Sequence, residues 1–362
     1  MTLSVSDNIE RLWIFRSNLR IFEYYHKINN LAEFKEKCHD FYLLLGLELL
    51  RTQRVQKEVI IWRQTPPNVK PFEILFSVKS NNGSVAFFRQ KFVSNFSDCF
   101  LNEKPDITLF RGGFPEYDDL VKRDKEFFGL SLYLPTGIRV KPIYGGSYDE
   151  ILIESLSDFS SGVPFYKTAN PEVFFHQKHS LKPKEFDLIL PSNFSNSKQK
   201  GQEYFITQVV AISSFLKSLK ILHAGNEPSK GTQICNKVNV TNIHFLGWQS
   251  RKTLNFLFNK SKFVVITSTK LDGCPRTLTE AMCSGTPVCV YKDTRALPYY
   301  ENIPGFERFE TASDLERIIK DNEIKEVIVD PQRKLDFSTI VEKNFSLWFK
   351  SLAKKSPQVN KI

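Results

Sequence analysis

The sequence lacks several features that would place it in a specialised class of protein. Its six cysteines are scattered and form no C-x-x-C pair, so a zinc ribbon, a redox motif or a disulfide scaffold is not expected. No apolar run near the start is long enough to cross a bilayer, and the first residues lack the basic and apolar regions of a secretory signal. We therefore expect a cytoplasmic protein whose thiols are reduced.

Methionine is also scarce, and phenylalanine takes its place in the predicted cores. The chain of 362 residues has 2 Met and 32 Phe, and 41% of its residues are hydrophobic while 25% are charged. This composition indicates ordinary packed cores, and the length predicts two domains. The 50 Lys and Arg exceed the 40 Asp and Glu, which gives a net charge of +10. Such an excess favours an acidic partner (nucleic acid, anionic lipid or a phosphorylated small molecule) without choosing among them.

Short apolar runs alternate with helical patterns along most of the chain, which predicts an α/β fold. The patterns predict helices over residues 7–52, 85–100 and 202–219, and a further helix that Ser250 caps. They predict strands that include residues 106–110 and 130–134.

We expect two Rossmann-like, doubly wound domains facing a cleft, with a polar linker near residues 168–184. The expected parts are an N-terminal helical extension, an acceptor-side domain, a donor-side domain, and a C-terminal helix with a basic tail, at residues 1–56, 57–178, 179–335 and 336–362.

The segment over residues 267–290 carries the clearest chemical signal. It follows a predicted buried strand and contains a helix bounded by Pro275 at its start and Gly285 just beyond its end. A loop that enters a helix N-terminus presents free backbone N–H groups and the positive end of the helix dipole, which together suit a phosphate. Arg276 in the first turn opposes that dipole at a cost of about a few tenths of a kcal/mol, which a bound anion would offset.

Two carboxylates flank this helix start. Glu280 lies about five residues into the helix, and its carboxylate can accept two hydrogen bonds at once, as the vicinal hydroxyls of a ribose require. Asp272 lies in the loop before the helix, where it could hold sugar hydroxyls. An exposed acid in a loop and an ordinary acid on a helix surface would show the same spacing. The spacing of Asp272 and Glu280 therefore indicates a binding site only together with the residues around it.

That context resembles a known family. The interval Asp272-x7-Glu280, followed by the residues AMCSGTPV, resembles the E-x7-E signature of retaining GT-B glycosyltransferases, and most closely glycosyltransferase family 4, the group 1 glycosyl transferases. Upstream, Lys200 and Gly201 stand where the family has a lysine-glycine pair. The residues HFLG at 244–247 are followed by a helix rich in Leu and Phe and by a strand over residues 263–266, and this order is similar to the family's order of elements. The resemblance covers about residues 186–300.

The resemblance implies a role for each matching residue. Lys200 would bind the donor diphosphate, Glu280 the nucleotide ribose, and Asp272 the donor sugar at the catalytic centre. The loop and first turn would border the sugar and phosphates through Gly273, Cys274, Pro275, Arg276 and Thr277. No D-x-D triplet occurs, so no metal or other cofactor is expected, and the leaving diphosphate would be stabilised by cations and the helix dipole.

The sequence departs from the family pattern in two places. The first acid is Asp272 rather than Glu, so its carboxylate reaches about one methylene less far, and the donor sugar or its geometry would differ. Ser195 stands where the family often has an arginine for the diphosphate, and Arg276 or Arg111 could replace that cation. In the first half, Gly83 is the candidate for a glycine-rich loop, and Arg111 with Gly112 could contact the acceptor or a phosphate as well as form a simple turn.

Taken together, these features predict a metal-independent, retaining glycosyltransferase that moves a sugar from a nucleotide-diphosphate donor to a glycan or lipid-linked acceptor. A nucleotide-sugar epimerase or a phosphorylase of the same fold, or a non-catalytic sugar-nucleotide or polyanion-binding module, remain open alternatives. Nucleic-acid binding is supported by net charge alone, and we do not expect it. The lysines after residue 344 could contact anionic lipid at the inner membrane face, or the helix before them could pack against the first domain.

Overall fold

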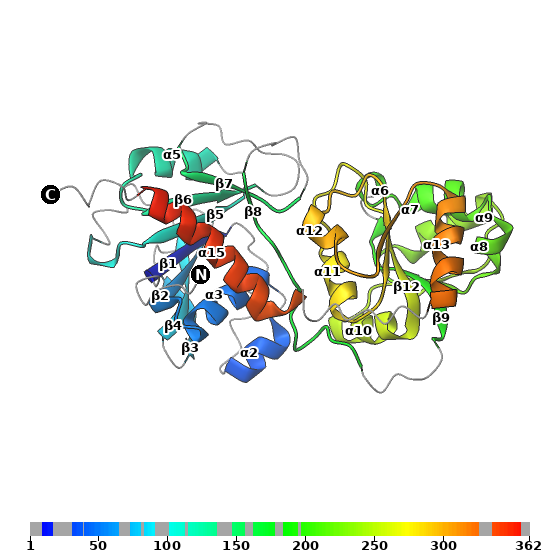
Figure 1. Ribbon diagram of the computed structural model, residues 1–362, viewed down its shortest axis with the longest axis horizontal. Helices are drawn as coiled ribbons and strands as arrows, with labels where there is room; N and C mark the ends of the chain where they lie inside the picture. The colour runs from blue at the N-terminus through cyan, green and yellow to red at the C-terminus, as the bar shows by residue number, and fades with distance from the viewer. Residues whose placement is uncertain are drawn as a thin grey trace. The chain divides into compact units, whose positions relative to one another are not determined.

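A computed structural model of the chain divides into two compact units, drawn as ribbons in Figure 1. Unit 1 comprises residues 1–154, 158–166 and 338–362, and unit 2 comprises residues 155–157 and 167–337. The residues that the structure describes are 9–16, 31–38, 40–64, 73–80, 83–90, 101–112, 115–135, 147–155, 162–177, 184–194, 197–325 and 335–355.

Unit 1 is built on an eight-stranded sheet of order β3-β4-β2-β1-β5-β6-β7-β8, in which only the edge strand β3 runs antiparallel to its neighbour. The sheet contains the strands β1 Ile9–Arg16, β2 Val55–Gln64, β3 Glu73–Ser80, β4 Gly83–Gln90, β5 Ile107–Arg111, β6 Leu130–Leu134, β7 Glu150–Ile153 and β8 Val163–Pro164. The helical elements of the same unit are α2 Leu31–Lys37, α3 Phe41–Arg51, η1 Leu101–Glu103, α5 Pro115–Arg123 and α15 Phe337–Lys355.

The predicted N-terminal helical extension is wrong in its first part. Ile9–Arg16 is strand β1, which lies between β2 and β5 in the middle of the sheet. Leu12, Trp13, Ile14 and Phe15 are all fully buried, so both faces of the strand are covered. A strand covered on both faces has no alternation of polar and apolar residues, and its apolar run cannot be told from a buried helix by periodicity alone. The later part of the prediction is confirmed by α2 and α3.

The helix predicted over residues 85–100 is also wrong at its start. Gly83–Gln90 is strand β4, which pairs with β3 in a hairpin and with β2 in parallel. Gly83 pairs with Ser80 at this hairpin, next to Asn81 and Asn82, which lie outside the described residues. It therefore stands at the amino end of β4. Ligands in open α/β sheets bind beyond the carboxyl ends, so this position gives Gly83 no part in a phosphate loop.

Aromatic side chains fill one face of the first sheet. Phe15 stacks on Phe110 and Trp62, and Trp13 meets Trp62 edge to face at 4.9 Å between ring centroids. Helix α5 closes this face through residues such as Leu120. Helix α3 lies on the other face, and it begins where the side chain of Asp40 accepts hydrogen bonds from the first-turn N–H groups. Phenylalanine and tryptophan thus do the core filling that the composition predicted.

Unit 2 is built on a six-stranded parallel sheet of order β11-β10-β9-β12-β13-β14. Its strands are β9 Phe186–Leu190, β10 Ile221–His223, β11 Ile243–Phe245, β12 Ser261–Ile266, β13 Val288–Tyr291 and β14 Phe306–Phe309. The order reverses between β9 and β12, since the chain builds outward from β9 to β11 and then returns to β12 on the other side. The α/β class with two parallel-sheet domains is confirmed.

Helices alternate with the strands of unit 2 along the chain. They are α6 Ser197–Lys200, α7 Gln202–Tyr204, α8 Ser214–Ser218, α9 Pro228–Lys237, α10 Arg251–Lys260, α11 Arg276–Cys283, α12 Pro298–Glu301 and α13 Ala312–Lys325. The single helix predicted over residues 202–219 is instead α7, a π-helical turn η3 at Phe205–Val210, and α8, which begins at the N-cap Ser213. Ser250 caps α10 as predicted, accepting a hydrogen bond from the N–H of Thr253.

The segment predicted as a linker is largely bound to unit 2. The side-chain oxygens of Asn255 and Asn259 on α10 accept hydrogen bonds from the N–H groups of Phe175 and Gln177. Lys167 and Thr168 hydrogen-bond within the same unit, to Tyr300 and Leu335. Backbone N–H groups of this segment are thus paired by side-chain amides of α10, and no periodic pattern within the segment reveals such pairing.

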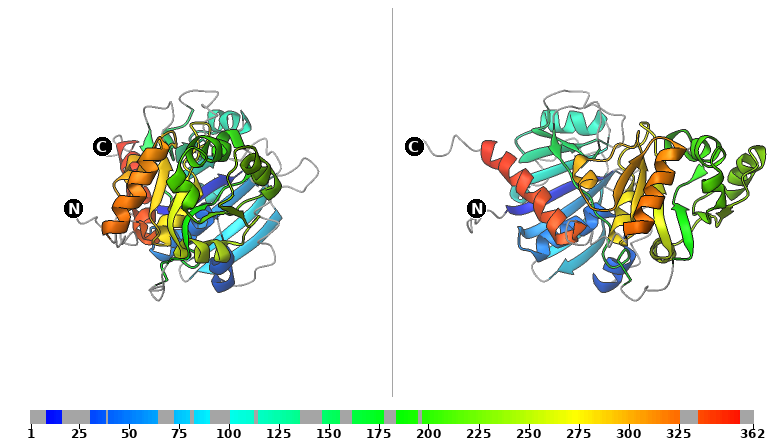
Figure 2. Two further views of the ribbon diagram at one scale, coloured as in Figure 1. Left: turned by 90° about the vertical axis from the view of Figure 1, so that its right-hand side faces the viewer. Right: turned by 45° about the vertical axis from the view of Figure 1, so that its right-hand side comes forward.

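The C-terminal helix α15 belongs to unit 1, against which it lies in Figures 1 and 2. Ile340, Val341, Phe345 and Trp348 are buried, and the Asn344 amide pairs with both backbone groups of Tyr166. The apolar face predicted for this helix is therefore used for packing, and it is not available to a lipid surface. The basic tail after residue 355 lies outside the described residues. None of the helices that the structure describes combines the length and apolarity that crossing a membrane requires.

Candidate active site

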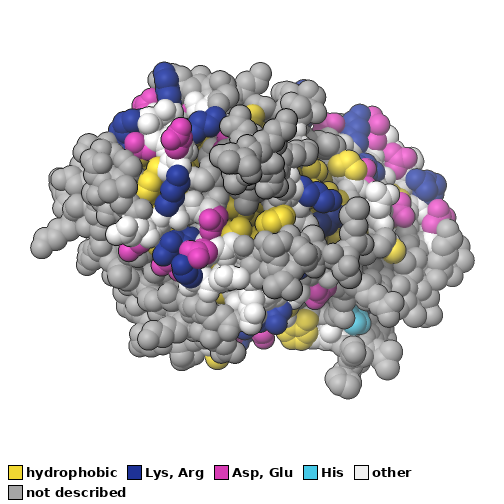
Figure 3. Space-filling view, turned by 60° about the vertical axis from the view of Figure 1, so that its left-hand side comes forward, with side chains coloured by type: hydrophobic (Ala, Val, Ile, Leu, Met, Phe, Trp, Pro, Cys, Tyr) yellow, Lys and Arg dark blue, Asp and Glu magenta, His cyan; other side chains and the backbone are white. Residues whose placement is uncertain are grey.

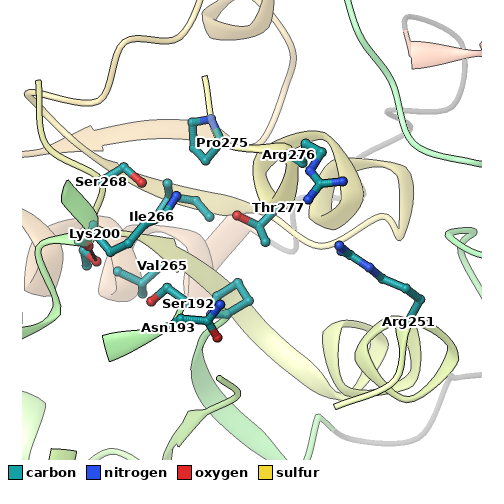
Figure 4. Close-up of a pocket in the computed structure, with 12 residues that line it drawn as sticks. Ser192, Asn193, Lys200, Arg251, Val265, Ile266, Ser268, Pro275, Arg276 and Thr277 are labelled. Atoms are coloured by element: carbon teal, nitrogen blue, oxygen red, sulfur yellow. Dashed lines mark hydrogen bonds between the residues drawn. The ribbon is translucent and has the colours of Figure 1, made fainter. Parts of the chain in front are cut away.

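A pocket of about 180 Å³ lies in unit 2 beyond the carboxyl ends of β9 and β12, where the strand order reverses. This reversal is the position at which open α/β sheets bind their ligands. Figure 4 shows the pocket with its lining side chains. The lining residues are Pro191, Ser192, Asn193, Lys200, Arg251, Val265, Ile266, Thr267, Ser268, Pro275, Arg276 and Thr277.

The turn that carries Lys200 is fixed to the loop after β12 by three hydrogen bonds. Thr267 Oγ1 donates to the backbone oxygen of Lys200, and Thr269 donates from its N–H to Gln199 and from Oγ1 to Lys198. Gly201 follows with φ of 66°, and a Cβ atom there would lie 2.1 Å from the oxygen of Thr267. The lysine-glycine pair thus has a physical reason, because only glycine allows this close approach in a left-handed conformation.

Lys200 and Asp272, which are 72 positions apart, form an ion pair at the pocket. Lys200 Nζ lies 2.5 Å from Asp272 Oδ2, and the Ser268 hydroxyl donates to the same oxygen at 2.9 Å. Both side chains are partly exposed, at 29% and 20%. An ammonium group has three N–H donors, so the pair with Asp272 leaves two for phosphate oxygens. The structure thus brings together the two residues that the sequence assigned to the donor diphosphate and the donor sugar.

Helix α11 begins at the pocket without a side-chain cap, and in its first turn the N–H of Leu278 donates to the backbone oxygen of Pro275. Pro275 is the N-cap residue and makes no side-chain hydrogen bond to the helix, while Arg276 and Thr277 line the pocket. The N–H groups of Arg276 and Thr277 and the helix dipole carry partial positive charge toward the space between β9 and β12. The helix ends as predicted, because Gly285 has φ of 77° just beyond the C-cap residue.

Glu280 is a buried residue of α11, four positions after Arg276, and one of its carboxylate oxygens is paired. Arg251 Nη1, from the first residue of α10, lies 2.5 Å from Glu280 Oε1, and the Glu280 side chain is 8% exposed. The other oxygen, Oε2, is buried and has no hydrogen-bond partner among the described residues. A buried carboxylate oxygen without a partner is costly, so this oxygen indicates a position where a ligand donor would be stabilised.

The charges around the pocket leave a positive excess. Asp272 and Glu280 are each paired with a cation, Lys200 and Arg251. The exposed Arg276 guanidinium has no hydrogen-bond or ion-pair partner within the described part of the chain. In Figure 4 the guanidinium groups of Arg251 and Arg276 point toward one another. This excess, added to the α11 dipole, makes the pocket suited to an anion. No group of three His, Cys, Asp or Glu gathers as a metal site would require, within the described residues.

His223, at the end of β10, does not act as a base toward this pocket. Its ring packs against Phe194 and Phe245, and it is 1% exposed. Burial lowers the pKa of His223 to about 4, so the imidazole is neutral at pH 7 and shielded from solvent. His244 is exposed on the edge strand β11. The apolar strand contexts of both histidines indicate core positions, which the structure confirms for His223 and not for His244.

The structure places the other predicted site residues in three groups. Gly273 and Cys274 lie in the loop between Asp272 and Pro275 and do not line the pocket. Asp272 and Glu280 do not line it either, and they reach it through their partners Lys200 and Arg251. Arg111 and Gly112 lie in unit 1 at the end of β5, and the N–H of Gly112 donates to Leu134. Ser195, where the family often has an arginine, lies outside the described residues.

Sequence reasoning missed Arg251, Ser192, Asn193 and the hydroxyls of Thr267 and Ser268. Four of these directly follow β9 or β12, so the rule that ligands bind beyond carboxyl strand ends could have found them. Arg251 had a weaker signal, as a cation in the first turn of a helix, where it opposes the dipole. Arg251 and Glu280 are 29 positions apart on two different helices, so the spacing of residues in the sequence could not predict that they pair.

The part of the chain that forms this site is similar to a known protein family. The family described as "Glycosyl transferases group 1" matches residues 185–302, which include the pocket and the α11 helix. A search of curated proteins gave no match. The resemblance predicted from residues 186–300 is therefore confirmed on nearly the same span.

Solved structures match nearly the whole chain. Their sequence identities to it are low, so the matches show similarity of fold alone. A glycosyltransferase from Rickettsia africae is 16% identical with a TM-score of 0.58, over 96% of this chain and 97% of that one. Trehalose 6-phosphate synthase from Burkholderia multivorans is 9% identical with a TM-score of 0.56, over 96% of each chain. A protein from Anabaena in complex with UDP is 11% identical with a TM-score of 0.53, over 96% of this chain and 99% of that one.

Fold and site together define a two-unit α/β protein of GT-B architecture with an anion-suited pocket at the switch point of its second sheet. More narrowly, the stretch over residues 185–302, which contains the pocket, is similar to the family described as "Glycosyl transferases group 1".

Proposed function

We propose that this protein is a glycosyltransferase that binds a nucleotide-diphosphate sugar in the unit 2 pocket and transfers the sugar to an acceptor. The observation that carries the proposal is Glu280, which is paired with Arg251 on one oxygen and has its other oxygen buried without a described partner, beside the uncapped start of α11. A ribose hydroxyl on that oxygen and a diphosphate at the helix start would satisfy both features at once.

The remaining pocket residues support distinct parts of the donor. Lys200, with two N–H donors to spare, and the N–H groups of Arg276 and Thr277 suit the two phosphates. Asp272, held by Lys200 and Ser268, suits hydroxyls of the sugar. The Anabaena protein was solved with UDP, which agrees with a nucleoside diphosphate as the ligand class for this fold.

In the proposed reaction, the bond between the anomeric carbon and the phosphate oxygen breaks, and its electron pair goes to the leaving diphosphate. Lys200 and the α11 N-terminus stabilise that developing charge, and no metal is required for it. The acceptor hydroxyl forms the new bond, and its proton goes to the departing phosphate oxygen on the same face of the sugar. This route retains the anomeric configuration, and it needs no covalent nucleophile from the protein.

A panel of nucleotide sugars tests the donor class. In a panel that also contains a CMP-sugar, we expect one of the UDP-, GDP-, ADP- or dTDP-sugars to raise the melting temperature, with the same shift in the presence of EDTA. A ligand at about a hundred times its Kd adds about 2.7 kcal/mol to the free energy of unfolding. The measurement is a thermal-shift series with each donor, with and without EDTA.

The outcomes separate the proposed transferase from its alternatives. A shift abolished by EDTA would contradict metal independence, and no shift with any donor would contradict the donor site. Binding followed by interconversion of donor sugars without an acceptor would identify an epimerase. Binding without turnover across a wide set of acceptors would favour a non-catalytic module.

A further inference from the structure

Two polar side-chain contacts join α10 to α11, and they lie one helical turn apart. The first is the ion pair between Arg251 and Glu280, whose arginine lines the pocket. The second lies four positions further along both segments, where the hydroxyl of Ser284, the C-cap residue of α11, donates to Oδ1 of Asn255 at 2.7 Å. Four residues of helix span about 6 Å along the axis, so the second contact lies one turn behind the pocket.

The ion pair by itself does not fix the position of the Glu280 carboxylate. Arginine and glutamate side chains have many rotamers, and the Arg251 side chain is 26% exposed. A carboxylate that accepts hydrogen bonds from a ribose must nevertheless be held in place, because a small displacement of a binding group weakens a directional contact. The position of Glu280 therefore depends on how α11 is held against α10.

The contact between Asn255 and Ser284 is of the kind that holds two helices in register. Asn255 is 3% exposed and Ser284 is fully buried. Both side chains are short and have few rotamers, so a hydrogen bond between them fixes the two backbones more closely than a contact between long side chains does. The Ser284 hydroxyl also lies 2.8 Å from the backbone oxygen of Glu280. The contact thus includes the residue whose carboxylate would bind the ribose.

A second role of Asn255 has to be separated from this one. Asn255 and Asn259 are four positions apart on the same face of α10, and they accept hydrogen bonds from the N–H groups of Phe175 and Gln177. Asparagine is a weak helix former and is mostly exposed in proteins, so two buried asparagines in a short helix need a reason. Holding the segment over residues 175–177 accounts for both asparagines, whereas the hydrogen bond from Ser284 is not needed for that.

Ion pairs on the surface of the protein have no comparable support. In Figure 3 the described Lys and Arg side chains have Asp and Glu side chains beside many of them. Exposed pairs of this kind contribute little, because water solvates both partners in many geometries. The Glu280 side chain is 8% exposed, so its pairing depends on protein groups that are held in fixed positions.

From these contacts we infer that Asn255 and Ser284 are positioning residues for the nucleotide, which hold the Glu280 carboxylate where it binds the ribose. Neither of them lines the pocket, so they act through the register of α10 and α11. The inference rests on the proposed function, because it concerns the carboxylate to which the ribose is assigned there. The phosphates should not be affected, since the turn of Lys200 is held separately by the hydroxyl of Thr267.

The test compares Ser284→Ala with Thr286→Val as a matched control. The Thr286 hydroxyl is also buried, and it donates to the backbone oxygen of Phe258 on α10 at 2.8 Å. Each variant thus removes one buried hydrogen bond to α10, and we expect similar decreases in melting temperature. In Ser284→Ala, Oδ1 of Asn255 keeps the hydrogen bond from the N–H of Phe175, so that segment stays bound.

The readout is the preference for a ribose, measured by calorimetric titration of the full-length protein. The ligands are UDP, GDP and ADP, the 2′-deoxy and 3′-deoxy analogues of the one that binds, and inorganic pyrophosphate. We expect Ser284→Ala to lower the preference for the ribose over its deoxy analogues by about three- to tenfold, and Thr286→Val to leave it unchanged. Pyrophosphate affinity should stay the same in both variants. If Ser284→Ala does not fold, Ser284→Cys takes its place, because a thiol keeps the volume and is a weaker donor.

A double variant separates this inference from the proposed function. In the Glu280→Ala background, Ser284→Ala should cause no further loss of nucleotide affinity, because the carboxylate that it positions is absent. A full ribose preference in Ser284→Ala, an equal loss in Thr286→Val, or losses that add in the double variant would each overturn the positioning role. A ribose preference that survives Glu280→Ala alone would instead contradict the ribose assignment in the proposed function.

Discussion

Replacing Lys200 with alanine should lower the rate of sugar transfer by about 10²–10³-fold, because a preorganised cation at the leaving group is lost. Lys200 lies beside the uncapped start of α11, where the diphosphate charge develops, and it is fixed there by the hydrogen bonds between residues 198–200 and the loop after β12. The loss should fall mainly on kcat, since the charge on the diphosphate is greater in the transition state than in the bound donor. Steady-state kinetics with the donor identified by the panel measure both parameters.

Lys198→Ala is the matched control for this variant. Lys198 lies two positions earlier on the same short helix, its side chain is exposed, and its backbone oxygen keeps the hydrogen bond from Thr269. The control should retain transfer within about threefold. If Lys198→Ala loses as much activity as Lys200→Ala, the effect comes from the turn as a whole, and the assignment of Lys200 to the leaving group is contradicted.

Replacing Glu280 with alanine should weaken nucleoside diphosphate binding by about 100-fold, because hydrogen bonds from ribose hydroxyls to a charged carboxylate are lost. The affinity for inorganic pyrophosphate, which has no ribose, should not change. The fold should persist, because the described ion pair of the Glu280 side chain is with Arg251. The Arg251 side chain is 26% exposed, so water can solvate its guanidinium when the carboxylate is removed. Calorimetric titration with both ligands, together with the melting temperature of each protein, gives these quantities.

A change in the ligand provides a second test of the same contact. The wild-type protein should bind a nucleoside diphosphate more tightly than its 2′-deoxy or 3′-deoxy analogue, and Glu280→Ala should remove that preference. The coupling between the side chain and the hydroxyl is then measured as in a double-mutant cycle. If the variant keeps the full preference, the ribose is recognised elsewhere, and the role given to Glu280 is wrong.

The fold of unit 2 could be predicted closely from the sequence because its strands are short, apolar and separated by turns. Ser250, Pro275 and Gly285 marked the ends of their helices, and the structure agrees with each. The interruption at η3 was not predictable, because residues 202–219 keep a helical pattern of apolar residues through the π-helical turn.

Unit 1 was harder to predict, for a physical reason. Strand β1 is covered on both faces, so Leu12, Trp13, Ile14 and Phe15 form one apolar run without alternation. In β4, Phe87 and Phe88 follow one another, which also hides the period of two. The strands that were predicted correctly, such as β5 and β6, are bounded by glycine, proline or charged residues that mark their ends.

The candidate site was predictable where a short motif holds its residues together. Asp272, Pro275, Arg276 and Thr277 lie within six positions of the chain; the last three line the pocket, and Asp272 pairs with Lys200, which also lines it. The family resemblance assigned Lys200 and Asp272 to one donor site, but it did not predict their ion pair. The Arg251–Glu280 pair depends on which helices become neighbours, and it leaves no mark in the spacing of residues.

Hydrogen exchange with and without the nucleoside diphosphate of the bound donor tests the central claim most directly, which is that the unit 2 pocket holds the donor. Bound ligand should slow amide exchange in peptides that cover residues 191–201 and 267–280, and the largest effect should fall on the uncapped N–H groups at the start of α11. Peptides from β1, β2 and β5 should not change. Stoichiometric binding that protects unit 1 and leaves both unit 2 peptides unchanged would contradict the account.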